Sequence, residues 1–187
     1  GVVPDLVSFG KGIANGYPIA AVAGRKDLLE QIEEGVFVST TFGGDSIAMA
    51  AALATLKRLE KTEYYEHINE IGTMLRNGIQ ERIDKYNLSD VLSVSGLPAH
   101  CGVNFEGFGS LSYLDIQSVY SQTMIQNGII VFAIYFLNSS HTQKEVSAYL
   151  QATDKAFHLI RQAIDYDSVD DILVGGKVDP IFKRNIK

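Results

Sequence analysis

The chain has 187 residues, of which 46% are hydrophobic and 20% are charged, a balance typical of a folded protein that excludes a disordered one. Its sixteen basic and twenty-two acidic residues give a net charge of −6, which argues against a nucleic-acid partner. No apolar run is long enough to cross a bilayer, and a single cysteine, Cys101, excludes an internal disulfide and fits a reducing compartment, so we expect a cytoplasmic protein without a membrane partner.

The first part of the chain alternates between strand and helix. Short apolar runs at 5–9 and 18–24 are bounded by Pro and Gly, which is typical of strands buried on both faces. A short helix is predicted from Asp27 to about Glu34. The stretch 36–45 ("VFVSTTFGGD") is strand-like before it turns at a Gly-Gly pair.

An Ala-rich run follows and predicts a helix, for which Asp45 or Ser46 is a suitable N-cap. A second periodic segment places apolar residues on one face at helical spacing. Its inner positions are Ile68, Ile71, Leu75, Ile79 and Ile83. Together the two segments predict one long helix or a bent pair that links two lobes, with a lobe boundary near Asn87.

Strands and helices also alternate beyond Asn87. Strands are predicted at 91–96, 101–107 and 129–137, and a helix at 112–128 that stops at Gly128. Thr142 and Glu145 form a capping box for a last helix. The inner face of that helix is Val146, Tyr149, Leu150, Thr153, Phe157, Ile160 and Ile164. The tail from 174 to 187 is expected to be an extended arm.

Lys11 stands between two glycines at the end of the first predicted strand. Such a lysine is either a solvated charge in a turn or an amine that forms an imine with an aldehyde, which requires a desolvated or positively charged setting. A phosphate-binding loop is excluded because "GKGIANG" lacks the G-x-x-x-x-G-K-[ST] order.

A second candidate is the stretch 39–52, "STTFGGDSIAMAAA". Hydroxyls and glycines directly before a helix N-terminus can bind an anion, because free backbone N–H groups and the helix dipole both favour a phosphate. Ordinary helix capping explains Asp45 or Ser46, but it does not explain two adjacent threonines before a Gly-Gly pair.

These two stretches together closely resemble class III (ω-type) aminotransferases, which are pyridoxal-phosphate enzymes of fold type I. The lysine motif matches from Pro4 to Pro18. The second motif, usually Thr-Phe-Gly-Gly-Asn-Pro, here ends in Asp45-Ser46. The resemblance implies an α/β chain with the end of the large cofactor domain at 1–60, a linking helix at 61–87 and a small C-terminal α+β domain with an extended tail at 88–187.

The resemblance also implies site residues and partners. Lys11 would hold pyridoxal 5'-phosphate as an imine and then shuttle a proton between the substrate carbon and the cofactor carbon. Thr41 would bind the cofactor phosphate, or Thr40 if the register slips by one, and in this family that threonine reaches the neighbouring subunit's site. We therefore expect a homodimer acting on a small amino donor and a carbonyl acceptor.

Other cofactor residues of the family lie well before the lysine: the phosphate-binding turn, the aromatic that stacks on the ring, and the aspartate at the pyridine nitrogen. The chain also begins without methionine and reaches a strand within five residues. We therefore expect a fragment with an incomplete site. The stretch 127–146 resembles the glutamate-1-semialdehyde aminomutase branch, and no arginine stands between Leu88 and Arg161 to bind a substrate carboxylate. Transferase and mutase both stay open.

The remaining candidates favour structural roles. His141 precedes a helix beside its capping box, Arg25 ends a strand, and the adjacent His100 and Cys101 do not make a metal site. The aromatic residues of the predicted strand 129–137 are expected in the core, although one of them could face a substrate channel; they are Phe132, Tyr135 and Phe136, and the candidate for the channel is Tyr135.

Two further functions compete with amino-group transfer. The chain could be a non-catalytic binding or dimerisation module that keeps the fold, an idea supported by Asp45-Ser46 and opposed by the intact Lys11. Racemisation or decarboxylation on the same cofactor is a third possibility.

Overall fold

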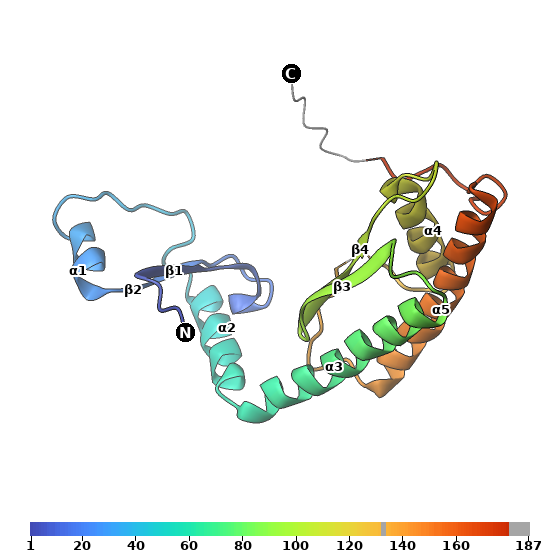
Figure 1. Cartoon of the computed structure of the whole chain (residues 1–187). Helices are drawn as coiled ribbons and strands as arrows, with labels where there is room; N and C mark the ends of the chain where they lie inside the picture. Colours follow the sequence, from blue (N-terminus) through green and yellow to red (C-terminus); the bar gives the residue numbers. More distant parts are fainter. Residues whose placement is uncertain (132–133, 180–187) are drawn as a thin grey trace, which may run out of the picture. The chain divides into compact units, whose positions relative to one another are not determined.

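The structure is a computed structural model that describes residues 1–131 and 134–179. It contains two compact units, Gly1–Tyr65 (unit 1) and Glu66–Lys187 (unit 2), whose helices and strands are labelled in Figure 1. Within the described ranges, no helix has the length and apolarity that crossing a membrane requires.

Unit 1 begins with a β-hairpin that carries Lys11. Strands β1 (Leu6–Phe9) and β2 (Ala21–Gly24) pair antiparallel over their full length. The 3₁₀ helix η1 (Lys11–Ala14) follows β1 directly and packs against helix α2 (Ser46–Leu59). The lysine therefore lies where a strand turns into a short helix, next to the longest helix of this unit.

The expectation that both strands are buried on two faces is wrong. The side chains of β1 and β2 are mostly exposed, and the buried residues of unit 1 are three alanines, Ala14, Ala48 and Ala52. A sheet of two strands cannot cover both of its own faces, so the apolar composition of these runs is not matched by burial within unit 1.

The segment between β2 and α2 also differs from expectation. The predicted helix 27–34 is divided into α1 (Lys26–Leu29) and the 3₁₀ helix η2 (Glu30–Ile32). The predicted strand at 36–45 is absent: the chain is irregular from 36 to 40 and turns over 41–44. Its β-branched and aromatic residues suit a pleated surface, but no neighbouring strand offers hydrogen bonds there.

The two helical segments form a pair rather than one long helix. Helix α2 begins after its N-cap Asp45, whose side chain accepts a hydrogen bond from the backbone of Ala48, so this predicted cap is confirmed. The helix ends at Leu59, with Glu60 as its C-cap, and α3 (Thr62–Lys85) begins after Lys61.

Unit 2 is built on a second hairpin. Strands β3 (Leu92–Leu97) and β4 (His100–Phe105) form where two strands were predicted, and they pair antiparallel. Part of the third predicted strand lies along the other edge of β4, where Ile134 bridges to Gly102. Residues 132–133 of that predicted strand lie outside the described residues.

Helices α4 (Tyr113–Gln126) and α5 (Gln143–Tyr166) complete this unit. Each begins with a capping box in which the N-cap side chain accepts a backbone hydrogen bond and the third residue of the helix bonds back to the N-cap. The box at Thr142 and Glu145 was predicted from the sequence and is confirmed.

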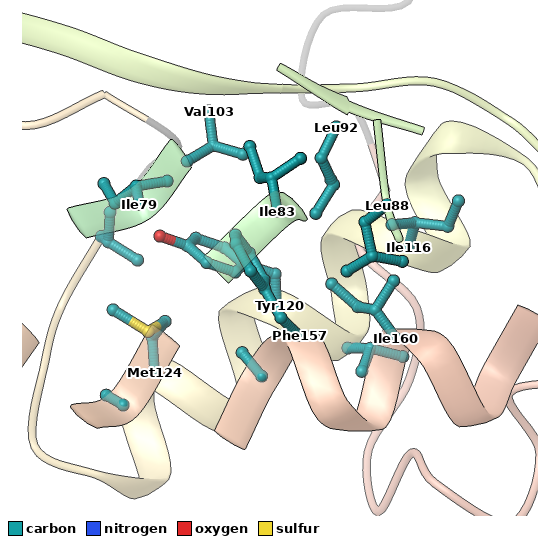
Figure 2. Packing of buried hydrophobic residues seen from close by; sticks show 14 of the residues in the cluster. Ile79, Ile83, Leu88, Leu92, Val103, Ile116, Tyr120, Met124, Phe157 and Ile160 are labelled. Atoms are coloured by element: carbon teal, nitrogen blue, oxygen red, sulfur yellow. The ribbon is translucent and has the colours of Figure 1, made fainter. Parts of the chain in front are cut away.

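The core of unit 2 lies between the hairpin and the three helices α3, α4 and α5. Figure 2 shows Tyr120 and Phe157 at its centre, with aliphatic side chains from the strands and the other helices around them. Helix α3 can lie close to the β3–β4 turn and to α5 because it has glycines at both contacts. An added Cβ at Gly72 would overlap the carbonyl of Pro98, and one at Gly78 would overlap the side chain of Leu150. The predicted inner face of α5 is buried except for the half-buried Leu150.

The chain after α5 lies along α4. The side chain of Gln122 accepts hydrogen bonds from the backbone of Val174 and donates one to the carbonyl of Ile172. Lys177 forms an ion pair with Asp115, at 2.5 Å. The predicted extended arm is thus fixed to α4 as far as Val178, and its residues 180–187 lie outside the described residues.

Candidate functional site

Lys11 is the first residue of η1 and follows the extended Gly10. Its backbone φ is +52°, in the left-handed region, and its side chain is exposed. The amine makes no hydrogen bond or ion pair with another described residue. A desolvated pocket around Lys11 is therefore not formed by unit 1 itself.

The left-handed conformation matters because it is unusual for a residue with a side chain. It costs a lysine about 1–2 kcal/mol relative to its ordinary backbone conformations. Hydrogen bonds on either side hold the turn, from the Ile13 N–H to the Gly10 carbonyl at 3.2 Å and from the Asn15 N–H to the Gly12 carbonyl at 3.1 Å. Residues held in this way cluster at functional sites, which makes Lys11 a candidate on geometric grounds.

The open end of the hairpin is closed by Arg25. Its guanidinium donates to Asp5 at 2.9 Å and to Asp27 at 2.6 and 3.0 Å. The hydrogen bond from Arg25 holds the pKa of the Asp27 carboxyl below its usual range. These side chains are exposed, so the ion pairs add little stability, and their geometry fits the structural role expected for Arg25.

A cavity of about 380 Å³ joins the two sequence motifs. One wall is made by Thr40, Thr41 and the following turn, and the other by Pro18 and the two residues after it. The two threonines therefore come together with the Pro end of the lysine motif. Lys11 itself does not line this cavity.

Gly43 lines this cavity and lies against Thr40. A Cβ at this position would overlap the hydroxyl oxygen of Thr40. The glycine thus lets the Thr40 hydroxyl lie against the backbone of Gly43, in a turn closed by a hydrogen bond from the Asp45 N–H to the Phe42 carbonyl at 3.2 Å. Two hydroxyls next to a glycine turn are suited to phosphate oxygens, which accept hydrogen bonds.

Unit 1 thus presents two separate groups that could serve a ligand with an aldehyde and a phosphate, and Lys11 does not line the cavity of the two threonines. Lys11 offers an unpaired amine for the aldehyde, and Thr40 and Thr41 offer hydroxyls for the phosphate. Sequence reasoning found both groups but missed the wall that begins at Pro18. The sequence signal for that wall was the Gly-Tyr-Pro turn at the end of the lysine motif.

The start of α2 departs from the expected anion site in one respect. The Oδ1 atom of Asp45 accepts a hydrogen bond from the Ala48 N–H at 2.6 Å. One of the N–H groups that were expected to be free for a phosphate is therefore bound by a carboxylate. The threonine hydroxyls, rather than the helix end, are the donors that the cavity offers.

Unit 2 contains a larger cavity of about 670 Å³. It is lined mainly by apolar side chains between 128 and 137, by Leu75 of α3 and by the first turns of α5. Tyr135 lines it, but its hydroxyl is buried and makes no hydrogen bond to another described residue. The polar residues that line it are Tyr135, His141, Glu145 and Tyr149, and its other lining residues are apolar or glycine.

The buried thiol and phenols of unit 2 are held neutral. Burial raises the pKa of the Cys101 thiol, and it also raises the pKa values of Tyr135 and Tyr149. Burial raises the pKa of Tyr120 to about 12, although its hydroxyl shares a 2.6 Å hydrogen bond with that of Tyr149. A protonated, buried thiol is a poor nucleophile, which fits the packing role expected for Cys101.

His141 has a structural environment. Its Nδ1 accepts a hydrogen bond from the Asn138 N–H at 3.1 Å, and its carbonyl accepts one from His67 Nε2 at 2.9 Å. His100 stacks edge-on against Phe136, with ring centroids 4.6 Å apart. In the described part of the chain, no cluster of His, Cys, Asp and Glu side chains is arranged to hold a metal ion.

Comparison with known proteins covers both units. The family model described as "Aminotransferase class-III" matches residues 1–166, which include the lysine motif, the two threonines and most of unit 2. Among solved structures, the internal aldimine form of the FumI protein of Sphingopyxis sp. MTA144, which contains pyridoxal phosphate (PLP), has a TM-score of 0.76 and 29% sequence identity over 87% of this chain. A transaminase with PLP bound has a TM-score of 0.78 at 22% identity, which supports the mixed α/β fold alone.

Curated relatives are similar in sequence over most of the chain. The glutamate-1-semialdehyde 2,1-aminomutase of Ruminiclostridium cellulolyticum is 34% identical over 169 residues, which is 83% of this chain and 38% of that protein. The glutamate-1-semialdehyde 2,1-aminomutase 2 of Lachnoclostridium phytofermentans is 31% identical over 159 residues, 78% of this chain and 37% of that protein. The chain thus spans well under half the length of these relatives.

Proposed function

Because the chain belongs to the class III aminotransferase family, we propose that it supplies Lys11 to a pyridoxal 5'-phosphate-dependent reaction that moves an amino group between a small amine and a carbonyl compound. The observation that supports this most directly is that the matched region contains Lys11 and both threonines of the cavity. The solved structures that resemble the chain include two that contain PLP.

When bound, the cofactor supplies an electron sink that stabilises negative charge on the substrate carbon. Lys11 would hold the cofactor through its aldehyde carbon. Once its amine is released, it would carry a proton between the substrate carbon and the cofactor carbon as a general acid and base. The exposed, unpaired amine of Lys11 is available for both tasks.

Thr40 and Thr41 would hold the phosphate through their hydroxyls. Thr41 is the preferred residue because it occupies the family's threonine position in the motif Thr41-Phe42-Gly43-Gly44. In the family this threonine serves the neighbouring subunit, so we infer a homodimer in which each chain contributes to two sites. The domain assignment proposed with this function is 1–60 for the end of the large domain, 61–87 for the linking helix and 88–187 for the small domain.

Within the family, the proposed branch is that of the glutamate-1-semialdehyde aminomutases, in which the amino group moves within one substrate. The support is the identity of 34% and 31% to proteins of that name. The described strands and helices of unit 2 also contain no arginine between Leu88 and Arg161 that could bind a substrate carboxylate.

One alternative has specific support. A non-catalytic module of the same fold would explain why the Lys11 amine is exposed and why Asp45-Ser46 stands where the family usually has Asn-Pro. That module would need no reactive lysine.

The test is covalent labelling. The protein is incubated with pyridoxal 5'-phosphate, reduced with borohydride, digested and analysed by mass spectrometry. In a longer form that supplies the family's earlier cofactor residues, we expect Lys11 to carry the reduced adduct in clear excess over Lys57, an exposed lysine of α2 in the same unit. The variants Lys11→Ala and Lys57→Ala provide matched controls, since only the first should lose the main adduct.

Equal labelling of Lys11 and Lys57 in the longer form as well as in this chain would contradict the proposed role and favour the non-catalytic module. If Lys11 is labelled selectively, product analysis with an added keto acid then separates the reaction types. A transferase consumes the keto acid, whereas a mutase, racemase or decarboxylase does not.

A further inference from the structure

The cap of α2 carries a negative charge beside the threonine cavity. The Oδ1 atom of Asp45 accepts a hydrogen bond from the Ala48 N–H at 2.6 Å, and the half-buried carboxylate makes no ion pair with another described residue. A carboxylate at a helix N-terminus is stabilised by the same dipole that would otherwise favour a bound anion. The Asp45 carboxylate therefore partly neutralises the positive potential at the N-terminus of α2.

The distance between this charge and the cavity is short. The cavity wall runs to Gly43, and Asp45 is two residues further along. Two residues of extended chain span at most about 7 Å, so the Cα atoms of Gly43 and Asp45 lie within that distance. A phosphate held by Thr40 and Thr41 would be close to the Asp45 carboxylate, with no described cation paired to the latter.

The charge is not required for capping. Asparagine and serine cap helices about as well as aspartate, because one side-chain oxygen is enough to accept the backbone hydrogen bond. The chain thus has at this position a cap whose charge opposes the binding of an anion. Beyond its attraction to the helix dipole, the charge adds nothing to the cap that a neutral residue would lack.

We propose that Asp45 is an affinity-determining residue that weakens the binding of phosphorylated ligands in the cavity between Thr40–Gly43 and Pro18–Ala20. This inference rests on the proposed function, because it assumes that the phosphate of the cofactor binds there. The threonine hydroxyls and the turn N–H groups then supply most of the attraction, and the phosphate is released more readily than from a neutral cap.

The size of the effect follows from Coulomb's law. A dianionic phosphate about 8 Å from one carboxylate, in a water-like dielectric, loses about fivefold in affinity. Added salt screens this repulsion, since the Debye length falls from about 30 Å at 0.01 M to about 8 Å at 0.15 M ionic strength. The effect should therefore be largest at low salt.

The experiment compares the protein with its Asp45→Asn variant, using pyridoxine 5'-phosphate as the probe because it has the phosphate but no aldehyde. Binding is measured by equilibrium dialysis at 0.01 M and 0.15 M ionic strength. Pyridoxine, which lacks the phosphate, is the ligand control. Glu60→Gln is the matched protein control, because it removes one negative charge at the other end of α2, about 21 Å away.

We expect Asp45→Asn to bind pyridoxine 5'-phosphate about fivefold more tightly at low salt, with a smaller gain at high salt. Pyridoxine binding and the Glu60→Gln variant should show no change. Asp45→Ser, a second neutral cap, should behave like Asp45→Asn, and matching far-UV circular dichroism shows that α2 is intact.

Unchanged or weaker phosphate binding in both neutral variants would overturn the inference, as would an equal gain for pyridoxine. If neither protein binds pyridoxine 5'-phosphate while Lys11 is still labelled selectively, this inference fails and the proposed function stands. Absence of both phosphate binding and selective labelling would refute the two together.

Discussion

Gly72 is the position where a single added methyl group should have a large effect on unit 2. It lies on the buried face of α3 against the turn that joins β3 to β4. A Cβ there would overlap the carbonyl carbon and oxygen of Pro98. Because these are backbone atoms next to the paired residues Leu97 and His100, they cannot move away without disturbing the hairpin.

The expected change in the free energy of unfolding is the difference between two opposing effects. Replacing glycine by alanine in a helix gains about 0.5–1 kcal/mol, because the unfolded chain loses conformational freedom. Overpacking at a well-packed contact costs about 1–3 kcal/mol. The two ranges leave a net loss of up to about 2.5 kcal/mol, and because the overlap is with backbone atoms we expect Gly72→Ala to lower the free energy of unfolding of unit 2 by about 1–2 kcal/mol.

The assay is urea denaturation followed by far-UV circular dichroism, with two control variants on the same helix. Gly78→Ala would meet the methyl groups of Leu150, which can rotate away, so its effect should be smaller. Asn77→Ala is exposed and should be neutral or slightly stabilising. A Gly72→Ala protein as stable as Asn77→Ala would refute the close approach of α3 to the hairpin.

Two further predictions concern titratable groups of unit 2. In the folded state, a hydrogen bond from Lys177 and a weaker effect of one from Ser112 lower the pKa of the Asp115 carboxyl. The ionised carboxylate therefore stabilises the fold at pH values above its unfolded pKa of about 4. This contribution is lost as the pH falls through the lower pKa of the folded state. Urea titrations between pH 2 and 5 should thus show a flatter loss of stability for Asp115→Asn than for the unchanged protein, and parallel curves would contradict the ion pair. Tyr149→Phe removes the hydrogen-bond partner of the buried Tyr120 hydroxyl and should lower the free energy of unfolding by about 1–3 kcal/mol at pH 7. Because burial raises the pKa of Tyr120 to about 12, ultraviolet titration of the unchanged protein should find this phenol still protonated at pH 11. Ionisation of Tyr120 near pH 10 would contradict its burial.

The helices of unit 2 could be predicted because local and tertiary signals agree there. The box at Thr142 and the apolar spacing of α5 specify both where the helix begins and which face is buried. The Ala-rich α2 and its Asp45 cap were found in the same way. In these segments a side chain's neighbours in sequence are enough to define the element.

The strands of unit 1 could not be predicted to the same depth. An apolar run such as 5–9 indicates a strand whose side chains could be buried. Burial also requires other helices or strands packed on both faces, and no local sequence pattern specifies those. The stretch 36–40 has strand composition and no partner strand, so it stays irregular. A strand is defined by its hydrogen-bonded neighbour, which can lie anywhere in the sequence.

The candidate site shows the same division. Lys11, Thr40 and Thr41 were recognisable because their residue types and order carry the chemistry. The wall at Pro18 and the charged cap beside the cavity depend on how two distant segments fold together. Their roles as cofactor residues remain predictions that the labelling and binding experiments test.

At position 11, the backbone conformation favours glycine, whereas the proposed chemistry requires lysine. Glycine would adopt a φ of +52° without a penalty, but it has no amine, whereas lysine has the amine at a cost of about 1–2 kcal/mol. Selection for stability alone would favour glycine at position 11, which would extend Gly10 and Gly12 into an unbroken run of three. If the proposed role holds, the lysine is retained although glycine suits this backbone conformation better. A Lys11→Gly substitution would then stabilise the turn and end the reaction.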